Sequence, residues 1–194
     1  MFERIKDDKI AVTTSIVLMA AMLMKLLQAG ILSIMTDYYP LTFDNIINTA
    51  LGLMPTIMLL AYVLVYYKTE KPQLLLACTF VIQFAITALY AWTEYQAYGV
   101  INGSVVLGNG IWLLYYAFLI YVTYKGFENI NMIRVVMGGM IAYSIFSGMV
   151  TLTAFASYFP KETVMIATQV IALVGNICYY VATFLMVPKV VEEM

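Results

Sequence analysis

The feature that most constrains this chain is a series of six long apolar segments separated by short polar connections. Each segment is long enough to cross about 30 Å of hydrocarbon as an α-helix, which takes about 20 residues. Hydrophobic residues make up 63% and charged residues 11% of the 194 residues, too apolar a balance for a water-soluble domain of this size. We therefore expect an all-α, polytopic integral membrane bundle, a single transmembrane domain over residues 1–194 with spans at about 10–35, 46–67, 74–92, 105–124, 135–158 and 164–187.

Prolines mark where several of these helices are expected to start and stop. Pro72 falls at the first helical position before the third span, Pro160 lies in the last outer loop, and Pro188 closes the sixth span. Residues 1–9 mix basic and acidic side chains, and no small-residue cleavage site follows a short apolar core. The first span is therefore expected to be retained and not removed as a signal peptide.

The basic residues outside the spans predict the orientation of the chain. With six spans, all of them except Lys161 fall on one side of the membrane, namely Arg4, Lys6, Lys9, Lys68, Lys71, Lys125, Arg134 and Lys189. The positive-inside rule then places both termini in the cytoplasm and the protein in the cell membrane. The loops of the opposite, outer side are acidic instead and carry Asp37, Asp44, Glu94 and Glu162.

Short related motifs recur with a period of two spans. The first, third and fifth spans end in Thr36-Asp37-Tyr38, Thr93-Glu94-Tyr95 and Ser157-Tyr158, and the even-numbered spans carry Leu51-Gly52, Leu107-Gly108 and Val174-Gly175 near their starts. A bundle built from three helical hairpins of like orientation would produce this pattern. Chance would also produce it, because interfacial aromatic residues and glycines are both common in membrane helices.

Lys25 is the only fixed charge well inside any of the apolar segments. Along a helix it lies roughly 22 Å from Lys9, too deep for easy snorkelling back to the side on which the span begins. A charge at this depth costs at least about 2.5 to 3.5 kcal/mol and usually faces the bundle interior with a partner. No carboxylate lies at matching depth. Four explanations stay open: snorkelling to the outer interface, a water-bridged structural pair, a counter-ion for an anionic solute, and a lysine that desolvation makes neutral.

Polar and small side chains follow one face of each span, mostly in its outer half. They are Lys25 and Gln28 in the first span, Asn45, Asn48, Thr49, Gly52 and Thr56 in the second, Thr79, Gln83 and Thr87 in the third, Asn109 with Trp112 and Tyr116 in the fourth, Ser144, Ser147, Gly148 and Thr151 in the fifth, and Gln169, Ala172, Asn176 and Tyr180 in the sixth. The inner halves of the even-numbered spans are aliphatic and aromatic instead.

This uneven polarity has two interpretations. Amides, hydroxyls and small residues can serve as contacts between helices, where an interhelical hydrogen bond contributes about 0.6 kcal/mol on average. Alternatively, the polar faces converge on a pocket that opens to the outside and is closed below by apolar packing. A through-going channel would keep its polar lining as far as the inner mouth. The pattern therefore favours a binding site or a gated carrier over an open pore.

Catalysis and nucleic-acid binding are poorly supported. The chain has no histidine, which removes the usual general base and the commonest metal ligand. No paired carboxylates lie within a span, no Ser or Cys has a visible base at hand, and Cys78 and Cys178 lack His or Cys at ligand spacing, so we expect small buried thiols there. The net charge of -1 gives no reason to expect nucleic acid as a partner. We expect no enzyme activity, no catalytic residues, no metal and no cofactor.

In outline, six spans with cytoplasmic termini and an outward-half pocket resemble the substrate-binding subunits of energy-coupling-factor vitamin transporters. The resemblance is architectural and carries no diagnostic motif. Those subunits dock to their partner through a small-residue pattern in the first span, and its nearest counterparts here, Ala11 with Ser15 or Ala21 with Ala29, match only in fragments. The resemblance implies a solute-binding role, although fold analogy is a weak basis for assigning function.

We therefore expect a non-enzymatic protein that binds or transports a small solute through the outer half of the bundle. The expected ligand-binding residues are Lys25, Gln28, Asn48, Gln83, Asn109, Gln169 and Asn176, and the expected gating or rim residues are Asp37, Asp44 and Glu94. The alternative is a membrane sensor, anchor or scaffold subunit that oligomerises with copies of itself or engages a cytosolic partner protein. Its contacts would be Lys68, Lys71, Lys125, Arg134 and the tail at residues 189–194.

Overall fold

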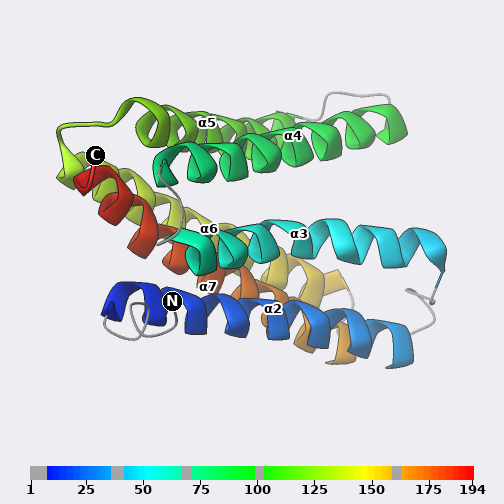
Figure 1. Cartoon of the computed structure of the whole chain (residues 1–194). Coiled ribbons are helices and arrows are strands. Elements are labelled where there is room, and N and C mark those ends of the chain that lie inside the picture. The colour runs from blue at the N-terminus through cyan, green and yellow to red at the C-terminus, as the bar shows by residue number, and fades with distance from the viewer. Residues whose placement is uncertain (1–7, 36–41, 67–70, 99–102, 159–162) are drawn as a thin grey trace.

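The computed structural model describes residues 8–35, 42–66, 71–98, 103–158 and 163–194. These residues form helices and no strand, which confirms the all-α prediction (Figure 1). Each expected span corresponds to one helix, and the helices extend beyond most of the expected bounds. They are α2 (Lys9–Met35), α3 (Phe43–Val65), α4 (Pro72–Tyr98), α5 (Gly103–Lys125), α6 (Ile130–Tyr158) and α7 (Thr163–Glu192).

Consecutive helices run in opposite directions, so the described chain begins and ends at the same end of the bundle (Figure 1). We call this end, where α2 begins and α7 ends, the terminal end, and the other the distal end. Each of the pairs α2–α3, α4–α5 and α6–α7 packs together, and the most extensive contact of all joins α2 to α7. The first and last helices therefore close the chain on itself.

Local capping explains most of the helix starts. The Asp8 side chain accepts hydrogen bonds from the backbone N–H groups of Ile10 and Ala11, and the Thr42 side chain accepts one from Asn45 at the start of α3. Pro72 is the first residue of α4, as predicted. At the other end of α5, Gly126 has a φ of 76°, the left-handed conformation that commonly follows a helix.

The prediction that Pro188 ends the last span is wrong, because α7 continues through it to Glu192. Proline removes one helical hydrogen bond, which usually stops a helix in isolation. Here the turn around Pro188 is fully packed: Met186, Val187 and Val190 are buried almost completely. The packing of this turn against the rest of the bundle outweighs the missing bond.

Ion pairs hold the C-terminal turn of α7 to the other helices. Lys189 forms an ion pair with Asp8 at the start of α2, and its ammonium lies 3.9 Å from Glu193 and 5.4 Å from the centre of the Tyr66 ring. On α6, Arg134 lies 2.7 Å from the carboxylate of Glu192. The segment at residues 189–194 is therefore part of the folded bundle and not a free tail.

Five of the described helices, α2, α3, α4, α6 and α7, are long and apolar enough to cross a membrane. The helical class is thus established together with several helices suited to a membrane.

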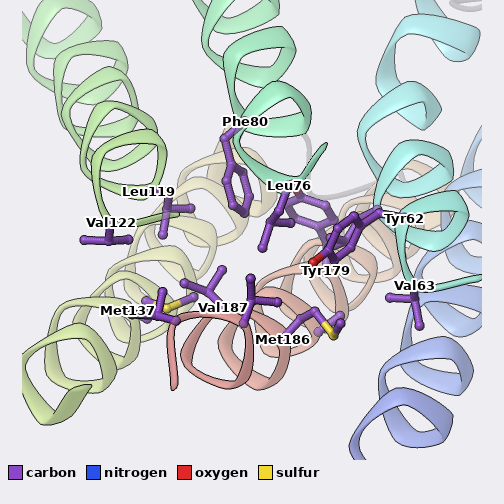
Figure 2. Packing of buried hydrophobic residues seen from close by; sticks show 14 of the residues in the cluster. Tyr62, Val63, Leu76, Phe80, Leu119, Val122, Met137, Tyr179, Met186 and Val187 are labelled. Carbon is purple, nitrogen blue, oxygen red and sulfur yellow. The ribbon is translucent and has the colours of Figure 1, made fainter. Parts of the chain in front are cut away.

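The buried core lies in the terminal half of the bundle. Side chains from α3, α4, α5, α6 and α7 point toward one another there (Figure 2). The largest of those that are fully buried include Tyr62, Phe80, Leu119, Met137 and Met186. Large apolar side chains at the distal end, such as Ile34 and Phe43, are exposed. The expectation of a buried thiol is wrong for Cys78, which is exposed on α4.

A glycine brings α2 and α7 into close contact at mid-height. A Cβ atom added to Gly175 would lie 3.2 Å from the Cβ of Met24 and 3.4 Å from the carbonyl oxygen of Ala21. Small residues allow helix backbones to approach in this way. Ala11 and Ala21, the small residues considered above as a docking pattern, are buried in the bundle. The approach also places the next turn of α2, which carries Lys25, beside α7.

Candidate solute-binding cavity

The side chain of Lys25 crosses from α2 to α3 and does not run along its own helix. Its Nζ donates a hydrogen bond of 3.0 Å to the backbone carbonyl of Gly52. Lys25 lies ten residues from the distal end of α2 at Met35, and Gly52 lies nine residues from the distal end of α3 at Phe43, so the two are at similar depth. The ammonium also lies 5.8 Å from the centre of the Tyr179 ring on α7.

Pro55 lies inside α3, three residues after Gly52. Proline has no N–H group, so the carbonyl of Leu51, next to that of Gly52, loses its usual helical donor. In membrane helices, polar groups of neighbouring helices compensate such interrupted turns. The sequence signal for this feature is Pro55, four residues after Leu51 and three after Gly52.

Lys25 lies on the wall of a cavity of about 310 Å³ between α2, α3 and α7, which we call the first cavity. This volume is at the lower end of the range of small-molecule sites, about 300–1,000 Å³. Its lining residues are Lys25, Gln28, Ala29 and Leu32 from α2, Asn48, Thr49, Gly52 and Leu53 from α3, and Ala172 and Asn176 from α7. Four of the predicted ligand-binding residues thus share one cavity.

Three amide side chains of the first cavity, those of Gln28, Asn48 and Asn176, have no hydrogen-bond partner within the described part of the chain. Asn48 and Asn176 are exposed and Gln28 is half-buried, so these amides are not packed as contacts between helices. These three instead present free donors and acceptors to the cavity. No carboxylate among the described side chains forms an ion pair with Lys25.

Gln83 lies below the first cavity and does not line it. Its side chain is 4% exposed and donates a hydrogen bond of 3.0 Å to the hydroxyl of Tyr179. The Tyr179 ring in turn lies under the ammonium of Lys25. Gln83 therefore joins α4 to α7 beneath the cavity. This is the first of the two interpretations of the polar residues, an amide that serves as a contact between helices.

A second cavity, of about 270 Å³, lies between α5, α6 and α7. Gln169 lines this second cavity, although it was expected in a single pocket with Lys25. Its lining residues are Trp112, Ser144, Ser147, Gly148, Thr151, Leu152, Gln169, Ala172, Leu173, Asn176 and Tyr180. Ala172 and Asn176 line both cavities, so the two adjoin along one face of α7.

The other predicted site residues are not brought into these cavities. Asn109 lines neither of them, although it precedes Trp112 by one turn of α5. Asp37 lies outside the described residues, and so do the side chains of Asp44 and Glu94. Among the side chains that the structure describes, no group of three or more Cys, Asp or Glu residues is arranged to hold a metal ion.

No protein-family model, curated protein or solved structure matches this chain. Fold and cavities together describe an all-helical protein with membrane-length helices and a mid-height cavity lined by one lysine and several amides.

Proposed function

We propose that this chain is a six-span protein of the cell membrane that binds or transports a small solute entering from the outer side. Alternating helix direction and the basic residues near the terminal end support cytoplasmic termini under the positive-inside rule. The sixth span would be α5, which has 23 residues and packs along α4. Its polar aromatic face would then be turned toward the protein, where Tyr115 and Tyr116 are buried.

The observation that carries this proposal is the ammonium of Lys25, which lines a cavity and, among the described residues, has a backbone carbonyl as its one hydrogen-bond partner. A neutral carbonyl leaves the positive charge uncompensated, and a charge at the centre of a bilayer costs at least about 2.5 to 3.5 kcal/mol. An anionic group of a solute would supply the missing negative charge. Gln28, Asn48 and Asn176 would supply the remaining hydrogen bonds.

Packing in the terminal half favours a binding site or a gated carrier over an open pore. Tyr62, Phe80, Leu119 and Met137 fill the region between the helices there (Figure 2). An aqueous path would need polar groups to continue as far as the terminal end. A solute in the first cavity would therefore require a rearrangement of this core to leave on that side.

The test compares Lys25→Met with wild-type protein in a thermal-unfolding assay against organic anions and their neutral amides. Wild-type protein should be stabilised by anions that bind, and Lys25→Met should lose this response while unfolding at the same or a higher temperature, because a costly charge is gone. A charge-assisted hydrogen bond contributes about 1.5–3 kcal/mol, so affinity should fall by roughly 10- to 150-fold.

Lys71→Met is the matched control, since Lys71 is exposed and lies at the start of α4 away from the cavity. It should leave the response to anions unchanged. If Lys25→Met responds to every anion as wild-type protein does, Lys25 has no role in binding and the proposed function is wrong.

The alternative role as a sensor or anchor relied in part on residues 189–194 as a tail that contacts a partner, and these residues are packed against the bundle. Lys189, Glu192 and Glu193 are engaged with the bundle, so deleting residues 189–194 would remove contacts of the fold itself. A search for a cytosolic partner is better made with the exposed Lys71 and Lys125 changed to glutamate. A partner lost from both variants would favour the alternative role.

A further inference from the structure

The second cavity differs in chemistry from the first, although the two share Ala172 and Asn176. Lys25 places a positive charge in the first cavity, whereas no charged side chain among the described residues lines the second. The second cavity has an aromatic wall in which the rings of Trp112 and Tyr180 stack with centroids 4.9 Å apart and an angle of 12° between their planes. The difference in charge means that one ligand group would not suit both cavities.

Polar groups of the second cavity are free to bind a ligand. The Trp112 indole N–H, the Ser144 hydroxyl and the Gln169 amide have no hydrogen-bond partner within the described part of the chain. The Ser144 side chain is 8% exposed, so its hydroxyl faces the cavity and not the surrounding medium. Trp112 and Gln169 are half-buried and line the cavity with Ser144, so a ligand in the cavity could reach their polar groups. Because the second cavity offers both hydrogen-bond donors and acceptors, it fits an uncharged ligand group that itself donates and accepts hydrogen bonds.

From this juxtaposition we infer that the two cavities form one two-part site for an elongated organic acid with an uncharged polar far end. The acid group binds at Lys25, and an amide or hydroxyl at the other end binds between Trp112 and Gln169. This inference rests on the proposed function, because it assumes that Lys25 holds an anion. Together the cavities, of about 310 and 270 Å³, accommodate a larger ligand than either does alone.

The experiment uses two series of acids of matched length, straight-chain carboxylates from butanoate to octanoate and the corresponding acids with a terminal amide, from succinamate to suberamate. Affinity is measured by thermal stabilisation of the full chain. Occupancy of the second cavity is followed by the fluorescence of Trp112 in a Trp92→Phe background, since Trp92 and Trp112 are the chain's two tryptophans. Trp92 is 58% exposed and its replacement should be tolerated.

Two leucine substitutions of glutamines provide matched variants. Gln169→Leu changes the second cavity alone, and Gln28→Leu changes the first alone. At the chain length that fits best, the terminal amide should raise affinity by about 3- to 10-fold and alter Trp112 emission, the gain expected of one hydrogen bond. Gln169→Leu should abolish that gain and leave the plain carboxylates unaffected, whereas Gln28→Leu should weaken both series.

Two results would overturn the inference in distinguishable ways. If carboxylates bind through Lys25 but the amide series neither binds more tightly nor alters Trp112 emission at any length, the second cavity is not part of the site and the proposed function stands. If neither series produces a response that Lys25→Met removes, the proposed function fails and the two-part site fails with it.

Discussion

At the scale of single residues, the ammonium of Lys25 on α2 meets α3 one turn before Pro55. The proline leaves the carbonyl of Leu51 without a helical donor, and the ammonium bonds to the next carbonyl, that of Gly52. This hydrogen bond holds the ammonium at the cavity wall through a backbone atom. An anion approaching Lys25 meets a positive group that is already oriented.

Pro55→Ala tests this arrangement. Alanine restores the N–H donor that the Leu51 carbonyl lacks, and we expect the resulting shift of this turn to move the neighbouring Gly52 carbonyl away from Lys25. We expect affinity for an anionic ligand to fall by about 3- to 10-fold, the equivalent of roughly one hydrogen bond, while the chain still folds. Pro188→Ala is the matched control, because Pro188 is also buried inside a helix but lies far from the cavity. Equal losses of affinity in both variants would contradict the proposed link.

The hydrogen bond between Gln83 and Tyr179 should contribute to stability and not to ligand contact. Gln83→Leu and Tyr179→Phe should each lower the unfolding free energy, and the double variant should lose less than the sum of the two. In a membrane protein the coupling is expected at about 0.6 to 1.7 kcal/mol. Denaturant titration of the four proteins in detergent measures it. Additive losses would mean that the bond has no net effect.

At the scale of the elements, the contact between α2 and α7 determines where the site forms. Gly175 lets the two backbones approach, and the first cavity opens one turn further toward the distal end, where α3 joins them. The same face of α7 carries Ala172 and Asn176 into both cavities. The last helix is therefore the common wall of the proposed site.

Gly175→Ala should separate α2 from α7 slightly, because the added methyl group meets the Cβ of Met24 and the backbone of Ala21. Overpacking of this kind costs about 1–3 kcal/mol. Gly139→Ala is the control, since a Cβ atom there meets nothing within 4 Å and alanine favours the helix. Thermal unfolding in detergent should show a loss for Gly175→Ala only. Unchanged stability in that variant would mean that the helices adjust without cost.

At the scale of the whole molecule, the two halves of the bundle are packed differently. In a bilayer the surrounding lipid is as apolar as leucine, so the terminal half would be held by close van der Waals contact and interhelical hydrogen bonds. Leu114, Val135 and Phe146 are 73%, 73% and 69% exposed and would face the lipid. The distal half retains cavities and free amides instead. The terminal half of the bundle is therefore closely packed, whereas the two cavities lie nearer its middle.

Cysteine labelling tests this asymmetry together with the proposed orientation. In a background with Cys78 and Cys178 replaced by alanine, Asn48→Cys should react with a membrane-impermeant thiol reagent added outside and not with reagent added inside. Ala77→Cys, which is 5% exposed in the terminal half, should react from neither side. Reaction of Asn48→Cys from the cytoplasmic side alone would reverse the orientation and contradict entry of the solute from outside.

Some of the site could be predicted from the sequence because depth along a helix follows directly from residue number. Lys25, Gln28, Asn48 and Asn176 were expected at one level, and one cavity contains all four. Direction around a helix is harder to predict when apolar residues surround it on every side. Gln83 and Gln169 were therefore expected at the same pocket, although one lies beneath it and the other in its neighbour.

By itself, the sequence determined the helical class, the approximate bounds of each helix and the depth of its charged and amide groups, since these depend on the length and composition of single segments. The tertiary structure decided which helices meet. Contact between α2, α3 and α7 places Lys25 at the carbonyl of Gly52, and the face of α7 with Ala172 and Asn176 divides the interior into two cavities. Such pairings arise from close packing between residues far apart in the chain, which the periodicity of one segment does not contain.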